Sequence, residues 1–210
     1  MVSKERIRNM TDVKIMVDTA SDAPQEILEK YNIGMLDMIS VFGETSYVMG
    51  RDITDEEFFE KIQECEKLPT TAQTPYAEMY DVLLKEVKEH KSVIYFTISS
   101  KGSGQHQTAR LVAEDIKEDY PEGDLHIVDT QTFSLFITCG AVYAAKLAEQ
   151  DKSVDEIIKE TMDYIAKWHV RFLVGSLHYL EKGGRINKTT ATVGTLLDLR
   201  PVLHVHDGLI

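Results

Sequence analysis

The chain has little cysteine and no long apolar run. Its 210 residues include only two cysteines, Cys65 and Cys139, which show neither metal-ligand spacing nor a disulfide pattern. No stretch approaches the roughly 20 apolar residues of a membrane span, and the N-terminus lacks the apolar core of a signal peptide. These absences favour a cytoplasmic protein without a membrane span.

Basic charge is also scarce. The chain carries 23 Lys and Arg against 35 Asp and Glu, a net charge of −12, which disfavours nucleic acid and anionic membranes as partners. Gly102-Ser103-Gly104 is neither a phosphate-binding P-loop nor a full dinucleotide fingerprint, because the closing Lys and the third glycine are missing. His204 and His206 alternate on one strand without a third ligand. We therefore expect no nucleotide cofactor and no metal.

Apolar runs alternate with helical patterns along most of the chain. Runs at 13–17, 93–98 and 125–128 predict buried strands, and segments of about 12–16 residues between them predict helices. This order indicates an α/β fold with a doubly wound, mainly parallel, Rossmann-like sheet over residues 13–168. We expect residues 1–12 to form a flexible leader and residues 169–210 to begin a second, smaller α/β domain that is incomplete in this chain. A strand at 201–205 and an Asp207-Gly208 turn predict a hairpin in it.

Polar residues follow three of the predicted strands. These are Asp18-Thr19, Ser99-Ser100 and Asp129-Thr130. In open parallel sheets, ligands bind beyond the carboxyl ends of the strands. Two carboxylates would repel an anion there, so we expect Asp18, Thr19 and Asp129 to orient neighbouring loops and hydroxyls.

The segment 99–104 joins a predicted strand to a predicted helix at 105–119. Its serines and glycines could point hydroxyls and free backbone N–H groups at a small anion, with help from the helix dipole. Alternatively, the serines cap the helix. A third reading makes Ser100 or Ser103 a nucleophile with His106 nearby, as in a serine hydrolase or acyltransferase, although a Gly-x-Ser-x-Gly elbow is absent.

Helix starts and two further loops can also be read from the pattern. Predicted N-caps are Asp22, Thr54, Thr74 and Ser153, the second and fourth as capping boxes. A hydroxyl-rich loop at 70–74 leaves Thr71 without a structural role. Gly183-Gly184 predicts a tight turn that needs positive φ or close backbone approach, and it presents Arg185 to an anion or a partner.

Taken in order, these motifs resemble the DegV family, the fatty-acid-binding subunits of bacterial fatty acid kinase. The resemblance covers about 190 residues and depends on the ordered set. Ala72 stands where the family pattern has a serine, and Gly102 and Gln105 stand where it has leucine and threonine. The motifs that carry it are Asp18-Thr19-Ala20-Ser21-Asp22, Thr70-Thr71-Ala72-Gln73, Ser99-Ser100-Lys101-Gly102-Ser103-Gly104, Asp129-Thr130, Leu180-Glu181-Lys182-Gly183-Gly184-Arg185-Ile186, and Arg200-Pro201-Val202-Leu203 with Asp207-Gly208.

The resemblance implies a long-chain fatty acid buried between the two domains. Its carboxylate would lie at Thr71, Ser100, Ser103 and Gly104, while Arg185 and Gly184 would contact the head group and the partner. A separate kinase subunit would supply ATP and form the acyl-phosphate. This chain would then present the substrate without catalysing its conversion, and the family's C-terminal region, which holds a histidine of the head-group site, is missing from these residues.

Overall fold

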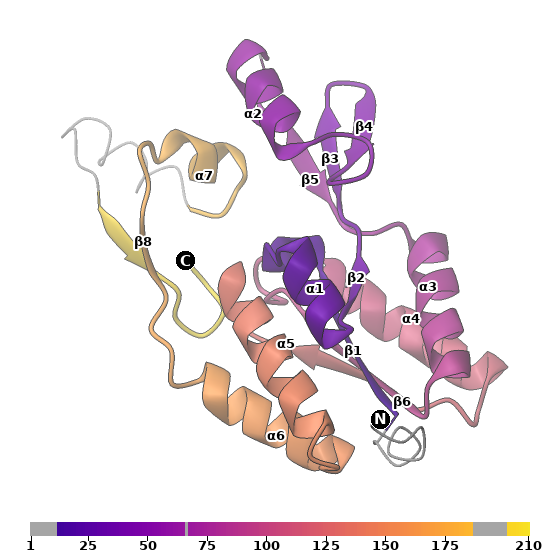
Figure 1. The fold of residues 1–210 in the computed structure, drawn as a ribbon. Helices are drawn as coiled ribbons and strands as arrows, with labels where there is room; N and C mark the ends of the chain where they lie inside the picture. The colour runs from indigo at the N-terminus through magenta and orange to yellow at the C-terminus, as the bar shows by residue number, and fades with distance from the viewer. Residues whose placement is uncertain (1–11, 66, 187–200) are drawn as a thin grey trace.

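A four-stranded parallel sheet forms the centre of the molecule. The computed structural model describes residues 12–65, 67–186 and 201–210 (Figure 1). The strand order is β2-β1-β6-β7, and every neighbouring pair is parallel. The chain pairs β2 on one side of β1 and later places β6 on the other side, so the strand order reverses between β1 and β6. The strands are β1 (Val13–Asp18), β2 (Gly34–Leu36), β6 (Ser92–Thr97) and β7 (Leu125–Asp129).

Helices cover both faces of this sheet, which confirms the predicted doubly wound α/β fold. Apolar residues of α3 (Tyr76–Glu89) and α4 (Gln105–Asp119) pack in one cluster with one face of the strands. The other face packs against α1 (Gln25–Tyr31), α5 (Leu135–Ala148) and α6 (Val154–Ile165). Each face of the sheet therefore has a hydrophobic core of its own.

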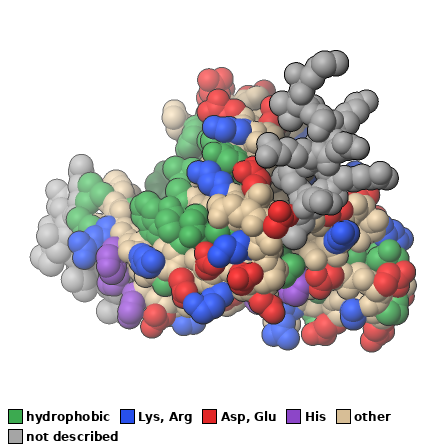
Figure 2. Space-filling model, turned by 60° about the horizontal axis from the view of Figure 1, so that its bottom comes forward, with side chains coloured by type: hydrophobic (Ala, Val, Ile, Leu, Met, Phe, Trp, Pro, Cys, Tyr) green, Lys and Arg blue, Asp and Glu red, His purple; other side chains and the backbone are tan. Residues whose placement is uncertain are grey.

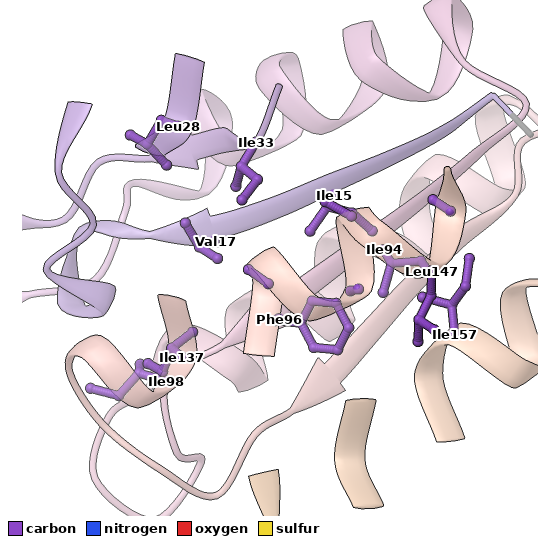
Figure 3. Packing of buried hydrophobic residues seen from close by; sticks show 14 residues of the cluster. Ile15, Val17, Leu28, Ile33, Ile94, Phe96, Ile98, Ile137, Leu147 and Ile157 are labelled. Atoms are coloured by element: carbon purple, nitrogen blue, oxygen red, sulfur yellow. The ribbon is translucent and has the colours of Figure 1, made fainter. Parts of the chain in front are cut away.

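The central strands show why this sequence gives two cores. Along β6, Ile94 and Phe96 belong to the α5 side, while Val93 and Tyr95 belong to the α4 side, and all four are fully buried. Side chains alternate between the faces of a strand, so a continuous apolar run supplies both layers. Figure 3 shows Phe96 and Ile94 on the strand, on the face that packs against α5 and α6. Full burial of one such side chain stabilises the folded state by about 1.5–3 kcal/mol.

A smaller unit, which we call the arm, stands apart from the central sheet (Figure 1). It consists of an antiparallel sheet in the order β4-β3-β5 and of α2 (Asp55–Glu64), and Phe42 makes edge-to-face contacts with Tyr47 and Phe58 inside it. The segment 70–74, which we predicted as a loop, instead contributes a strand. The arm strands are β3 (Ile39–Phe42), β4 (Thr45–Val48) and β5 (Thr70–Ala72).

The C-terminal segment contains β8 (Arg171–Leu173), α7 (His178–Lys182) and β9 (Val202–His204), with β8 and β9 antiparallel. Asp207 and Gly208 have φ of 48° and 75°, and a bridge joins His206 to Leu209, which confirms the predicted turn. The small residues of 189–197 also predict a helix, but this segment and residues 1–11 of the predicted leader lie outside the described residues. The division at residue 168 stays a prediction.

The structure confirms two of the four predicted helix N-caps. Thr54 and Ser153 form the predicted capping boxes with Glu57 and Glu156. The predictions for Asp22 and Thr74 were wrong, because a proline occupies the N-cap position in each case and neither helix has a side-chain cap. Asp22 instead accepts a hydrogen bond from the Ser134 hydroxyl, and Thr74 donates its hydroxyl to a backbone carbonyl.

Acidic and basic side chains are interspersed on the face shown in Figure 2, and hydrophobic side chains gather in one area of it. Within the part of the chain that the structure describes, no helix combines the length and apolarity needed to cross a membrane.

The capping box of α6 provides a test of the fold. Replacement of Ser153 by Ala removes the acceptor for the Glu156 amide and should lower the free energy of unfolding by about 1 kcal/mol. Urea denaturation measures this change. Ser153→Asp, which keeps a capping acceptor, should stay close to the wild type, and equal losses in both variants would contradict the capping assignment.

Candidate functional site: a cleft where the strand order reverses

A cleft of about 1000 Å³ opens beyond the carboxyl ends of β1 and β6. This is where the strand order reverses, the place at which open α/β sheets bind ligands. The loops that follow β1, β6 and β7 line it, together with β2, the arm and the C-terminal segment. Much of the lining is apolar and includes Met35, Met38, Ile39, Met49, Phe58 and Ile98.

Two of the four residues predicted at the ligand carboxylate line this cleft. Thr71 reaches it from β5, where it pairs with Ser40 of β3, and Ser103 reaches it from the β6–α4 turn. Ser100 and Gly104 belong to the same turn, are exposed, and are not part of the lining. The structure thus brings a hydroxyl of the arm and a hydroxyl of the turn to one cleft.

The amides of the β6–α4 turn are mostly occupied within the protein. Those of Gly102 and Ser103 donate to the Ser99 carbonyl, and that of Ser100 donates to Asp129 Oδ1 at 3.1 Å. The Gln105 amide donates to Ser103 Oγ at 3.2 Å, which gives the capping alternative one of its hydrogen bonds. Hydroxyl groups, more than free turn amides, therefore face the cleft from this loop.

The predicted loop-orienting residues all accept hydrogen bonds from backbone amides. Asp129 Oδ1 also accepts from the Gln131 amide at 2.9 Å, and Thr19 Oγ1 accepts from the Met38 amide at 3.0 Å. Asp18 Oδ2 accepts from the Ile98 amide at 3.0 Å. These contacts join β1 and β7 to the loops around the cleft.

Asp18 is fully buried and also accepts a hydrogen bond from the Tyr95 hydroxyl at 3.2 Å. Burial raises the pKa of Asp18 from its ordinary 3.8 to about 6, against the opposing effect of the hydrogen bonds from Ile98 and Tyr95. The protonated form is thus favoured by folding, because an ionised carboxylate loses most of its hydration in this position.

A chain of buried polar groups continues from Tyr95 to the base of the arm. Gln105 Nε2 donates to the Tyr95 oxygen and to Thr74 Oγ1, both at 2.8 Å, and Gln105 Oε1 accepts from the Thr74 amide at 2.9 Å. Thr74 Oγ1 in turn donates to the Asp37 carbonyl at 2.8 Å. We call Asp18, Tyr95, Gln105 and Thr74 the buried network. Sequence reasoning missed it, although a tyrosine inside an apolar strand was a signal.

Arg185 contacts the β6–α4 turn from the C-terminal segment. Its Nη2 donates to the Gly102 carbonyl at 3.0 Å, and Arg185 is one of the residues that line the cleft. Gly184 has φ of 73°, which confirms the positive φ predicted for the glycine pair. Gly102 itself packs beneath Phe133, since an added Cβ would lie 2.5 Å from the ring atom Cε1.

The residues considered for other chemistry lie in different surroundings. His106 Nδ1 contacts Thr97 Oγ1 at 3.0 Å, and burial lowers the pKa of His106. Within residues 12–65, 67–186 and 201–210, no hydrogen bond joins His106 to Ser100 or Ser103. His204 and His206 are exposed on the C-terminal hairpin, as predicted for a polar strand face.

One group of possible metal donors lies at the C-terminal end of α3. Ligand atoms of Glu86, Glu89 and His90 come within 4.8 Å of one another there. The His90 Nδ1 atom already contacts Asp12 Oδ1 at 2.6 Å. This arrangement also describes a histidine that contacts the carboxylates of Asp12 and Glu86 at the end of a helix.

A ligand-binding α/β protein is the class that this fold and cleft define, and comparisons with known proteins narrow it. The family model described as "Uncharacterised protein, DegV family" matches residues 12–210. A DegV domain-containing protein of Clostridium perfringens is 32% identical over 198 residues, which are 94% of this chain and 70% of the relative. A protein of Thermotoga maritima named "Fatty acid-binding protein" is 31% identical over 93% of this chain and 68% of its own.

Solved structures agree with this result. A fatty-acid-binding DegV family protein from Thermus thermophilus superimposes with a TM-score of 0.83 at 30% identity, covering 94% of this chain and 69% of that protein. A stearic-acid-binding protein from Eubacterium ventriosum gives 0.83 at 29% identity, with 93% and 68% covered. The chain belongs to the DegV family, which confirms the resemblance seen in its motifs.

The buried carboxyl group gives a pH-dependent prediction. Because the pKa of Asp18 is raised on folding, its contribution to stability should fall as the pH rises from about 4 to about 6, by at most about 3 kcal/mol. Asp18→Asn keeps an acceptor for Ile98 and Tyr95 but does not ionise. Urea unfolding of both proteins across this range should show the wild type losing stability relative to the variant, and parallel curves would contradict the assignment.

The buried network gives a second prediction. Gln105→Ala leaves the Thr74 amide without its acceptor and removes the donor to the Tyr95 oxygen, whose hydroxyl still donates to Asp18, so the unpaired amide should cost about 1–3 kcal/mol. The Thr74 amide should then exchange its hydrogen faster. The matched control is Gln107→Ala, which changes an exposed residue in the first helical turn of α4. Unchanged exchange at Thr74 in the Gln105 variant would show that the network does not hold the arm.

Proposed function

We propose that this chain binds a long-chain fatty acid in the cleft and presents its carboxylate to a separate ATP-dependent kinase subunit, which forms the acyl-phosphate. The observation that carries the proposal is the composition of the cleft. Apolar residues such as Ile98 and Phe58 line it together with two hydroxyl-bearing residues, Ser103 and Thr71, and with Arg185. A molecule with an apolar tail and one acidic end matches this lining.

The two ends of such a ligand have different energetic needs. Burial of the tail contributes about 0.8 kcal/mol per methylene, so most of the affinity comes from the apolar walls. The carboxylate loses hydration on entry and needs hydrogen-bond donors in return. Neutral hydroxyls supply these donors while leaving the carboxylate reactive toward a phosphoryl donor.

The charges around the cleft favour one placement of the carboxylate. Asp22 and Asp55 also line the cleft and repel an anion, whereas Arg185 attracts one. Ser103 Oγ accepts from the Gln105 amide, which leaves its own hydrogen free to donate. We place the carboxylate at Ser103 and Thr71, beside Ser100 and Gly104 of the same turn, with Asp18, Thr19 and Asp129 holding the surrounding loops.

In this proposal the chain has no catalytic residue and acts as a substrate-presenting protein in the cytoplasm. The exposed turn with Gly184 and Arg185 would contact the head group and the kinase subunit. Fatty acid binding by relatives supports the ligand, since DegV proteins from two organisms are described as binding fatty acids. The resemblance of the ordered motifs supports the kinase partner.

Ligand analysis tests this function. Native mass spectrometry of the full chain should detect a bound long-chain fatty acid. Ser103→Ala and Thr71→Val should each raise the Kd for the acid by about tenfold or more, because a hydrogen bond to a charged group is worth about 1.5–3 kcal/mol. The Kd for the methyl ester should change less. Thr45→Val, an exposed hydroxyl of the arm outside the cleft, is the control.

Two results would overturn the proposal. The first is purified protein that repeatedly holds no acyl chain and takes up none when one is supplied. The second is stoichiometric labelling of Ser100 or Ser103 by a fluorophosphonate, which would favour the serine hydrolase alternative instead.

A further inference from the structure

A group of methionines contributes to the lining of the cleft. Three of the chain's eight methionines, Met35, Met38 and Met49, line it, and all three come from β2 and the adjoining arm. We call these three residues the methionine wall. Each is partly exposed, so its thioether side chain reaches the cleft without being fully enclosed by the protein.

The backbone beneath the methionine wall is held in place. Met35 pairs with Val17 in the central sheet, and the Met38 amide donates to Thr19 Oγ1 at 3.0 Å. Met49 forms a bridge with Ile53. Any change in the shape of the methionine wall therefore comes from movement of its side chains and not from its backbone.

The remaining apolar lining is stiffer. It includes Pro24, Ile39, Phe58, Ile98 and Phe133, which are cyclic, β-branched or aromatic, and of these Ile39 and Phe58 belong to the arm. Phe133 lies against Gly102, where an added Cβ would come within 2.5 Å of the ring, so the ring has little freedom on that side. Ile98 belongs to the buried core of the central sheet (Figure 3).

Methionine is suited to surfaces that accept ligands of different outline. Its side chain is unbranched, has three rotatable bonds and ends in a polarisable thioether, so it repacks at low cost. Surfaces rich in methionine recur in binding proteins that accept many partners. A β-branched side chain at the same position would be restricted at its first torsion angle and would fit fewer shapes.

We propose that the methionine wall makes this protein tolerant of acyl chain shape, so that straight saturated chains and chains bent by a cis double bond bind with similar affinity. The inference rests on the proposed function and adds the breadth of the substrate class to it. The stiff residues of the lining stay fixed, and the methionine wall adjusts to the bend and length of the chain.

The test compares a panel of ligands on the full chain. Kd values for palmitic, stearic and oleic acids should agree within about tenfold in the wild type. The triple substitution Met35→Ile, Met38→Ile and Met49→Ile should spread these values beyond tenfold, because the stiffened wall favours one chain shape. Met16→Ile, the same change in the buried core of β1, is the matched control and should keep the wild-type ratios.

The outcomes separate the two proposals. Strong discrimination between palmitic and oleic acids by the wild type, or wild-type ratios in the triple variant, would overturn the inference while leaving fatty acid binding intact. Failure to bind any of the three acids would overturn the proposed function and this inference with it. If the triple variant does not fold, Met38→Ile and Met49→Ile separately must each widen the ratios, and unchanged ratios in both would contradict the inference.

Discussion

The buried network of Asp18, Tyr95, Gln105 and Thr74 is the interaction on which the site depends. It begins at the end of β1, crosses β6, passes through the first turn of α4 and ends at the base of the arm. Each member would be costly to bury alone, and each is stabilised by the next. Because arm residues line the cleft, the network connects the core of the central sheet to that part of the lining.

The cleft itself follows from topology and local chemistry together. Reversal of the strand order between β1 and β6 separates the loops that follow them, and the arm and the C-terminal segment enclose the space beyond. Backbone groups of these loops are hydrogen-bonded to side chains such as Thr19 and Asp129. Fixed loops then leave the hydroxyls of Ser103 and Thr71 available to a ligand.

Much of the fold could be predicted because its signals are local. Apolar runs identified β1, β6 and β7, and two capping boxes located the starts of α2 and α6. The strand β5 was missed because Thr70–Ala72 is short, exposed and without apolar alternation. The buried network was missed for a different reason. Gln105 and Thr74 are 31 residues apart, and Asp18 and Tyr95 are 77 apart. No short stretch of sequence therefore contains both partners of either hydrogen bond.

Ser99 and Gly208 illustrate what such separation means during synthesis. The Ser99 hydroxyl donates to the Gly208 carbonyl at 2.7 Å across 109 residues, and an added Cβ at Gly208 would lie 2.5 Å from that hydroxyl oxygen. The central sheet has all its strands once residue 129 has left the ribosome, but Arg185 and Gly208 emerge much later. A nascent chain therefore has all four strands of the central sheet before it has the residues Arg185 and Gly208, which form hydrogen bonds with the β6–α4 turn.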